Sequence, residues 1–146
     1  MLTRTGGYAL HAALAIAERG GREDRAIPAM ELAEALEIPG TYLAKILQSL
    51  ARADILVSER GRQGGFRLAR PADQLHLIDV VAPFDDLGPD RQCLLGRGTC
   101  SEVGSCPAHQ EWREASAPAF RFFETRTLAD LVALRRDGTA TSPSGA

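Results

Sequence analysis

Apolar residues recur at helical spacing in the N-terminal part of the chain. The first repeat predicts a helix over residues 4–19, which Gly20-Gly21 ends. The second repeat predicts a helix that ends near Glu37. The third repeat predicts a helix that follows a short turn and runs to about Ala53. The apolar positions behind these predictions are Leu10, Ala13, Leu14 and Ala17, then Leu32, Ala33 and Leu36, and then Leu43, Ile46, Leu47 and Leu50.

The third predicted helix carries no acidic residue on the face opposite its apolar stripe. A short turn containing Pro39 and Gly40 precedes this helix. Two helices joined in this way match a helix-turn-helix, whose second helix enters the major groove of DNA. An ordinary solvated face on a helical hairpin is the alternative interpretation of the same segment. The residues on this face are Thr41, Ala44, Lys45, Gln48 and Arg52.

A β-hairpin is predicted directly after the third helix. Residues 55–60 and 66–69 are β-prone, and the Gly-rich run 61–65 between them supplies the turn. A helix-turn-helix followed by a basic hairpin is the winged-helix plan, in which an arginine of the wing can reach the minor groove. The hairpin therefore favours DNA binding over the solvated face. Its basic residues, with no acid between them, are Arg60, Arg62, Arg67 and Arg70.

The pattern after residue 70 predicts a short helix up to Phe84 that packs on the first helix, and then a break at Asp85. After residue 107 the chain becomes helical again, and Pro118 predicts either a bend near 114–118 or a helix that restarts with Pro118 in its first turn. The aromatic surface of this segment is larger than one helix of a small domain can hide, so we expect it to contact a second copy of the chain. The residues expected at that dimer interface are Trp112, Ala115, Ala119, Phe122 and Phe123.

The C-terminal residues predict one more helix and a tail. Thr127 and Asp130 have the spacing of a capping box, which starts a helix through Arg136. We expect a disordered tail over 137–146, dimerisation helices over 108–136, a cysteine loop that binds a cluster over 85–107, and a winged helix-turn-helix domain over 1–84. The predicted fold class is mainly α, with a β-hairpin wing and a long C-terminal dimerisation helix.

The composition is that of an ordinary globular domain, with 45% hydrophobic and 25% charged residues. The net charge of −2 does not by itself indicate nucleic acid, so the local clustering of arginine matters more. No apolar run approaches the roughly 18–20 residues that span a bilayer, and the N-terminus lacks the plan of a signal peptide. An odd number of clustered cysteines fits reduced thiols better than disulfides. We expect a cytoplasmic protein with no membrane partner.

All three cysteines fall in one Gly- and Ser-rich stretch. Cys93, Cys100 and Cys106 are followed by His109, with the spacing C-x6-C-x5-C-x2-H. Structural zinc sites usually pair cysteines separated by about two to four residues, whereas a two-iron cluster is larger and suits wider gaps. Three thiolates leave one ligand position open, and His109 is the nearest candidate for it.

Other interpretations of the cysteine stretch remain open at this point. One is a winged-helix regulator without a cluster that uses the thiols as a redox or zinc sensor. Another is an iron–sulfur carrier or electron-transfer protein with no role at DNA. An enzyme with a cysteine nucleophile is disfavoured, because no Cys–His–acid arrangement can be recognised in the sequence.

Taken together, these motifs resemble the Rrf2 family of winged-helix transcriptional regulators that sense through iron–sulfur clusters, of the IscR and NsrR type. The resemblance covers about residues 1–136. The first cysteine gap is six residues, where the family usually has five, and Ala44 stands where the IscR-like branch has a glutamate. The matching motifs are Leu2-Thr3 and Tyr8-Ala9, Tyr42-Leu43, Arg60-Gly61, Gly64-Gly65 with Leu68, the three cysteines, residues 106–113 and residues 127–131.

The resemblance implies a homodimer that binds double-stranded DNA at a palindromic operator and carries one [2Fe-2S] cluster per subunit. The regulator would sense iron, redox or nitric oxide status. Its cluster ligands would be the three cysteines and His109, because Gly7 stands where the nitric-oxide-sensing branch has its aspartate ligand. The DNA contacts we predict are Thr41, Tyr42, Lys45 and Gln48 in the recognition helix, and Arg60 and Arg62 in the wing.

Overall fold

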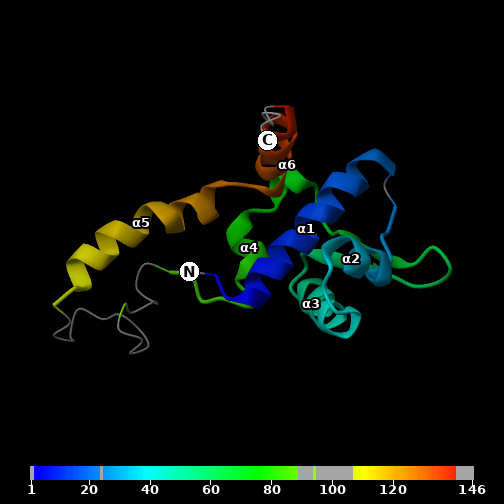
Figure 1. The fold of residues 1–146 in the computed structure, drawn as a ribbon, viewed down its shortest axis with the longest axis horizontal. Helices are drawn as coiled ribbons and strands as arrows, with labels where there is room; N and C mark the ends of the chain where they lie inside the picture. Colours follow the sequence, from blue (N-terminus) through cyan, green and yellow to red (C-terminus); the bar gives the residue numbers. More distant parts are fainter. Residues whose placement is uncertain (1, 24, 89–93, 95–106, 141–146) are drawn as a thin grey trace, which may run out of the picture.

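The computed structural model describes residues 2–23, 25–88, 94 and 107–140. The helices α1 to α4 and the hairpin form one body, and α5 extends away from it (Figure 1). This architecture is the winged helix-turn-helix that the sequence predicted. In chain order its elements are α1 (Arg4–Glu23), α2 (Ala29–Leu36), α3 (Gly40–Arg52), β1 (Leu56–Glu59), β2 (Gly65–Leu68), the 3-10 helix η1 (Ala72–Gln74), α4 (Leu77–Val81), α5 (His109–Thr125) and α6 (Leu128–Ala140).

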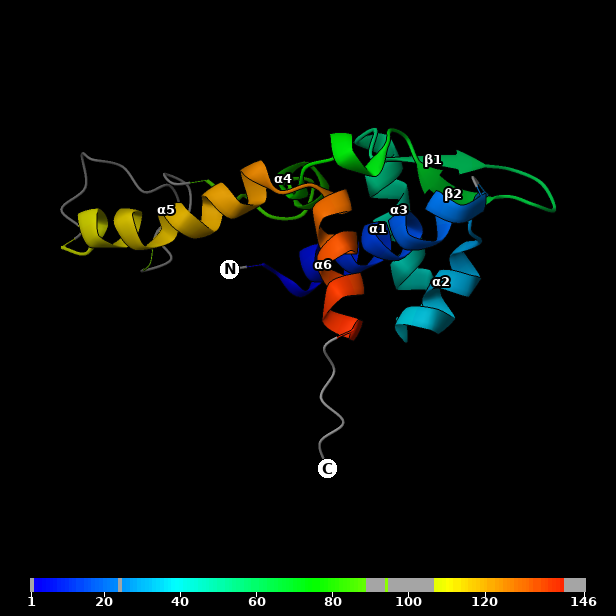
Figure 2. The ribbon, with the colours of Figure 1, turned by 90° about the horizontal axis from the view of Figure 1, so that it is seen from above.

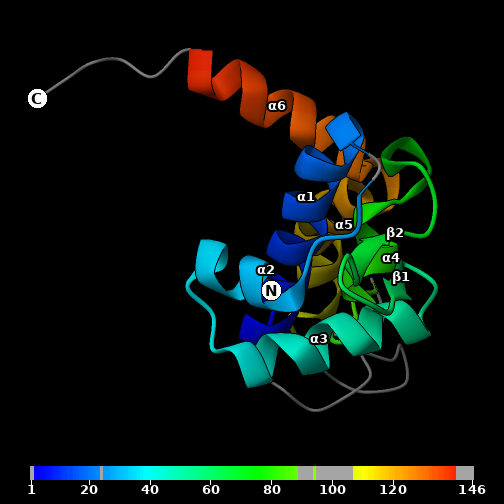
Figure 3. The ribbon, with the colours of Figure 1, turned by 90° about the vertical axis from the view of Figure 1, so that its right-hand side faces the viewer.

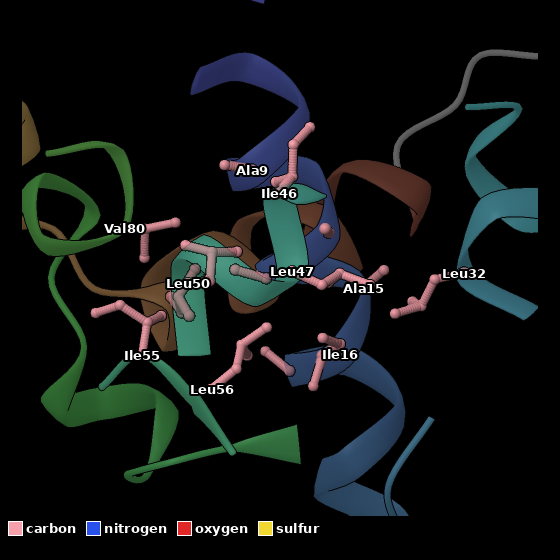
Figure 4. Packing of buried hydrophobic residues seen from close by; sticks show 14 of the residues in the cluster. Ala9, Ala15, Ile16, Leu32, Ile46, Leu47, Leu50, Ile55, Leu56 and Val80 are labelled. Atoms are coloured by element: carbon pink, nitrogen blue, oxygen red, sulfur yellow. The ribbon is translucent and has the colours of Figure 1, made fainter. Parts of the chain in front are cut away.

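The core lies where α3 packs against α1. The predicted apolar stripe of α3 is correct, since its leucines and Ile46 are at most 2% exposed. Figure 4 shows Leu47 directed toward α1, and Leu50 near Ile55 and Val80. The face of α1 that meets α3 is built mostly from alanine, and these small side chains allow the two helices to approach closely. Its most buried residues are Ala9, Ala12, Ala13 and Ile16, whereas Leu10 and Leu14 are half-buried.

Helix α1 is longer than the sequence predicted. It continues through Gly20-Gly21 to Glu23, so the expected end at residue 19 is wrong. Each glycine inside a helix costs about 1 kcal/mol relative to alanine. Helix α1 contacts α2, α3, α4, α6 and β2, and this packing outweighs the local preference of the glycines.

The wing is an antiparallel pair whose register joins Leu56 to Leu68. A third extended segment reinforces it, because Ile27 and Phe66 exchange two backbone hydrogen bonds of 2.8 Å. Gly65 has a φ of +150°, and a side chain there would collide with the carbonyl of Ile27. Glycine at this position therefore allows the base of the wing to dock against the domain.

Helix α6 starts with the predicted capping box. The Thr127 N–H donates to Oδ2 of Asp130 at 2.9 Å, and the Asp130 N–H donates to Oγ1 of Thr127 at 3.2 Å. The Thr127 N–H, and after it the Thr127 hydroxyl, which donates to the same Oδ2 atom at 3.1 Å, hold the pKa of Asp130 below its ordinary value. The carboxylate is thus charged at neutral pH, and the cap weakens only as falling pH protonates it.

The end of α6 differs from the prediction. The helix runs to Ala140, so residues 137–140 are helical and do not belong to a disordered tail. Leu128 and Val132 are buried against the core, and Arg135 pairs with Glu18 of α1 at 3.3 Å. The remainder of the predicted tail, 141–146, lies outside the described residues.

Helix α5 passes through Pro118 without interruption, so the predicted restart at this residue is wrong. Proline at position 118 removes the N–H that would bond to the carbonyl of Glu114. Glu114 is exposed, and water can satisfy that carbonyl. Figure 2 shows α5 and the hairpin at opposite ends of the molecule. In the described part of the chain, no helix is both long and apolar enough to cross a membrane.

Candidate nucleic-acid interface and cluster ligands

The polar face of α3 points away from the core. Figure 3 shows α3 along one edge of the domain, with α1 and α2 on its inner side. Thr41, Lys45, Gln48 and Arg52 are all exposed, and their spacing puts them on one face of the helix. Within the described residues Lys45 makes no ion pair, so its ammonium group is available to a ligand.

The tip of the wing presents two exposed arginines, Arg60 and Arg62, for which the described residues provide no acidic partner. Arg67 differs, because its guanidinium pairs with Glu59 across the hairpin. The positive charge of the wing is therefore concentrated at its tip. Because Glu59 neutralises Arg67, this arginine adds less to the positive charge of the wing than the sequence suggested.

Tyr42 is half-buried and engaged inside the domain. Its hydroxyl lies 2.5 Å from Oγ1 of Thr5, and its ring meets the ring of Tyr8 edge-on, with centroids 5.9 Å apart and an interplanar angle of 79°. These contacts join the N-terminal end of α3 to the first turns of α1. A contact between Tyr42 and DNA stays a prediction.

Asp85, where the sequence predicts only a break after a helix, is a buried residue. Its side chain is 5% exposed, and its two oxygens accept hydrogen bonds from the N–H and the hydroxyl of Thr3, at 3.0 Å and 3.1 Å. The two residues are separated by 82 positions in the chain. No local pattern in the sequence indicates a pair this far apart, so the sequence alone does not predict it.

The predicted cluster ligands are only partly within the described residues. Cys93, Cys100 and Cys106 lie outside them. His109 is the first residue of α5, and its Nε2 atom is buried. The backbone bond of 2.8 Å from the Trp112 N–H to the carbonyl of Ala108 closes the first turn of the helix around His109.

The aromatic side of α5 forms an apolar groove. None of its side chains is fully buried, and Phe122 is 42% exposed. Phe122 and Phe123 stack edge-on, with centroids 5.9 Å apart. The groove has a volume of about 220 Å³, and its lining includes four of the five residues predicted at the dimer interface, all but Phe122. The lining residues are Leu87, Gly88, Trp112, Ala115, Ser116, Ala119, Phe120 and Phe123.

A helix-turn-helix with an acid-free outer face, followed by a two-stranded wing with a basic tip, defines a winged-helix DNA-binding protein. The family model for Rrf2, described as an iron-dependent transcriptional regulator, matches residues 2–134 of this chain. The chain belongs to the Rrf2 family. It is a DNA-binding transcriptional regulator and not an enzyme, in agreement with the sequence analysis.

Individual relatives are similar over most of the chain. The HTH-type transcriptional regulator IscR of Sodalis glossinidius is 31% identical over 131 residues, which cover 90% of this chain and 78% of that protein. Protein aau3 of Rhizobium meliloti is 36% identical over 135 residues, which cover 92% of this chain and 86% of that protein.

Solved structures share the fold. IscR of T. potens superposes with a TM-score of 0.74 at 20% identity, covering 99% of this chain and 93% of that one. CymR, the global cysteine regulator of B. subtilis, superposes with a TM-score of 0.77 at 18% identity, covering 92% of this chain and 97% of that one. The similarity confirms the arrangement of the winged helix-turn-helix and the C-terminal helices.

Proposed function

We propose that this chain is a homodimeric regulator that binds a palindromic operator with an affinity set by the state of a [2Fe-2S] cluster. The observation that carries the proposal is the acid-free outer face of α3, with Lys45 exposed and without an ion pair in the described part of the chain. This face lies in a chain whose family is described as iron-dependent. Dimers of this class read two half-sites about one helical turn apart, so symmetric DNA is the expected target.

The DNA contacts divide between the two grooves. Thr41, Lys45 and Gln48 project from α3 and would meet base edges and phosphates in the major groove. Arg60 and Arg62 at the wing tip would reach the phosphates or the minor groove, where the negative potential attracts guanidinium groups. Tyr42 would hold the start of α3 in place and would contribute less to direct contact with DNA than the exposed residues of this helix.

The donor set fits an iron–sulfur cluster. Thiolates are the usual protein ligands of such clusters, and an imidazole can replace a thiolate on one iron. Cys93, Cys100, Cys106 and His109 supply that combination. When bound, the cluster would provide a centre that responds to oxidation, nitric oxide or iron supply.

His109 would connect the ligand set to the dimer helix. Because His109 is the first residue of α5, any change in its ligation acts directly on that helix. A shift of α5 would alter the separation of the two recognition helices, and a small rotation at the dimer axis is enough to lose the register of the half-sites.

The groove on α5 is the proposed dimer interface. Three aromatic side chains, two alanines and Leu87 make most of its lining apolar, and the same face of a second α5 has the matching chemistry. Ala119→Glu places a charge in this groove, where desolvation without a partner is costly. We expect the dissociation constant of the dimer to rise about a hundredfold or more, measured by sedimentation equilibrium.

Ala133→Glu is the matched control for this change. Ala133 is exposed on α6 and does not line the groove, so the same substitution there should leave the dimer intact. An Ala119→Glu protein that sediments as a dimer at the wild-type concentration would contradict the assignment of the interface.

Selection from a random-sequence DNA library tests the proposed function. Protein purified anaerobically, and the same protein after removal of its iron, are each allowed to enrich duplexes at fixed salt. We expect a palindromic consensus whose affinity differs between the two preparations. Enrichment by a preparation that contains only zinc, or no metal, would favour a thiol sensor, and the absence of any enriched sequence would contradict the proposal.

A further inference from the structure

The buried carboxylate of Asp85 joins two segments that lie far apart in the sequence. Asp85 closes the end of α4, where its backbone N–H donates to the carbonyl of Val81 at 2.9 Å. Its side chain accepts both hydrogen bonds from Thr3, immediately before α1. Oγ1 of Thr3 also accepts the N–H of Gly6 at 3.1 Å and so caps the first turn of α1. The position of this turn therefore depends on Asp85.

The same turn of α1 holds the recognition helix. Oγ1 of Thr5 and the hydroxyl of Tyr42 are 2.5 Å apart, and Tyr8 packs against the Tyr42 ring. Both contacts are made by Tyr42, which lies in the first turn of α3, two residues after Gly40. Residues 3–8 thus connect the end of α4 on one side to the start of α3 on the other.

The two glycines of this turn differ in their surroundings. A Cβ atom at residue 6 would overlap Oδ2 of Asp85 and lie 3.0 Å from its Cγ atom. A Cβ atom at residue 7 would meet nothing within 4 Å. The carboxylate occupies the space that only glycine at position 6 leaves open, and the neighbouring glycine serves as an internal control.

We propose that Asp85 is a positioning residue for DNA recognition, acting on Tyr42 and the start of α3 through the first turns of α1. The proposal rests on the proposed function, because it requires that α3 reads DNA.

Substitution of the two glycines tests the proposal in cluster-free protein, with the duplex selected by the wild type. Gly6→Ala should lower the DNA affinity about threefold to tenfold, the effect of losing one or two hydrogen bonds of ordinary strength. Gly7→Ala makes the same change one residue later and should leave the affinity at the wild-type value. Fluorescence anisotropy at fixed salt measures both, and circular dichroism confirms that each variant is folded.

A double-mutant cycle separates positioning from a general loss of stability. Asp85→Ala and Tyr42→Phe alter residues that do not touch, so independent effects on DNA affinity would multiply. We expect the double variant to bind no more than about twofold worse than Asp85→Ala alone, because both changes interrupt one connection. Asp85→Asn keeps one acceptor oxygen for the Thr3 N–H and should retain more affinity than Asp85→Ala.

Independent, multiplicative losses would overturn the proposal, as would equal affinities for Gly6→Ala and Gly7→Ala. If Asp85→Ala fails to fold, Asp85→Asn replaces it in the cycle with the same expectation. Failure of the proposed function is recognised separately, because the wild-type protein would then enrich no duplex.

Discussion

Replacing Lys45 and Arg60 together by alanine should lower the affinity for the selected duplex about a hundredfold or more, since each groove contact of this kind is worth roughly 1–3 kcal/mol. Lys45 lies on the exposed face of α3, and Arg60 begins the exposed tip of the wing. Within the described residues neither side chain has an acidic partner, so their charges are free to meet DNA. The double variant should also reduce the slope of log K against log salt by about one for each phosphate contact that is lost.

A second pair of basic residues provides the control. A guanidinium nitrogen of Arg19, in α1, lies 3.1 Å from a carboxylate oxygen of Glu31, in α2. A guanidinium nitrogen of Arg25, between the two helices, lies 3.7 Å from the other oxygen of the same carboxylate. Replacing these two arginines by alanine changes the net charge equally. Titration of labelled duplex at several salt concentrations compares the proteins. An unchanged affinity and slope in the Lys45 and Arg60 variant would contradict the assigned interface.

Leu50→Ala should lower the free energy of unfolding by about 2–5 kcal/mol, because it leaves a cavity in a core that cannot collapse fully. Leu50 is fully buried and lies near Ile55 and Val80, where α3, the base of the wing and α4 meet (Figure 4). Urea denaturation of cluster-free protein at one fixed concentration measures the loss, because the stability of a dimer depends on concentration.

Gln48→Ala is the matched control on the same helix. Gln48 is exposed, so its truncation should change the free energy of unfolding by no more than about 0.5 kcal/mol. Gln48→Ala should instead weaken DNA binding, which Leu50→Ala affects only through the fraction of folded protein. A loss below about 1 kcal/mol for Leu50→Ala would show that the site repacks and is not the rigid centre of the domain.

The features that the sequence predicted correctly are those that depend on short-range patterns of residues. The stripe from Leu43 to Leu50 follows helical periodicity, and the capping box between Thr127 and Asp130 spans a single turn. The hairpin is signalled by two β-prone runs around a Gly-rich turn. In each case the residues that interact are close in the chain, so their spacing alone indicates the structure.

The features that the sequence missed depend on contacts between distant segments. The Asp85–Thr3 pair joins residues on either side of the whole DNA-binding domain, and the length of α1 depends on packing that overrides Gly20-Gly21. The pairing of Arg67 with Glu59 required the strand register, which is set only when the hairpin forms. Of the four predicted cluster ligands, only His109 falls within the described residues. The presence of the cluster is therefore a prediction that iron and sulfide analysis tests.

An anaerobic absorption spectrum with iron and sulfide analysis tests the central claim most directly. We expect coloured wild-type protein with about two irons and two sulfides per subunit. His109→Ala should show a shifted spectrum and a less stable cluster, because the ligand at the start of α5 is lost. Colourless, iron-free wild-type protein that still binds the selected duplex with full affinity would contradict a cluster-dependent regulator.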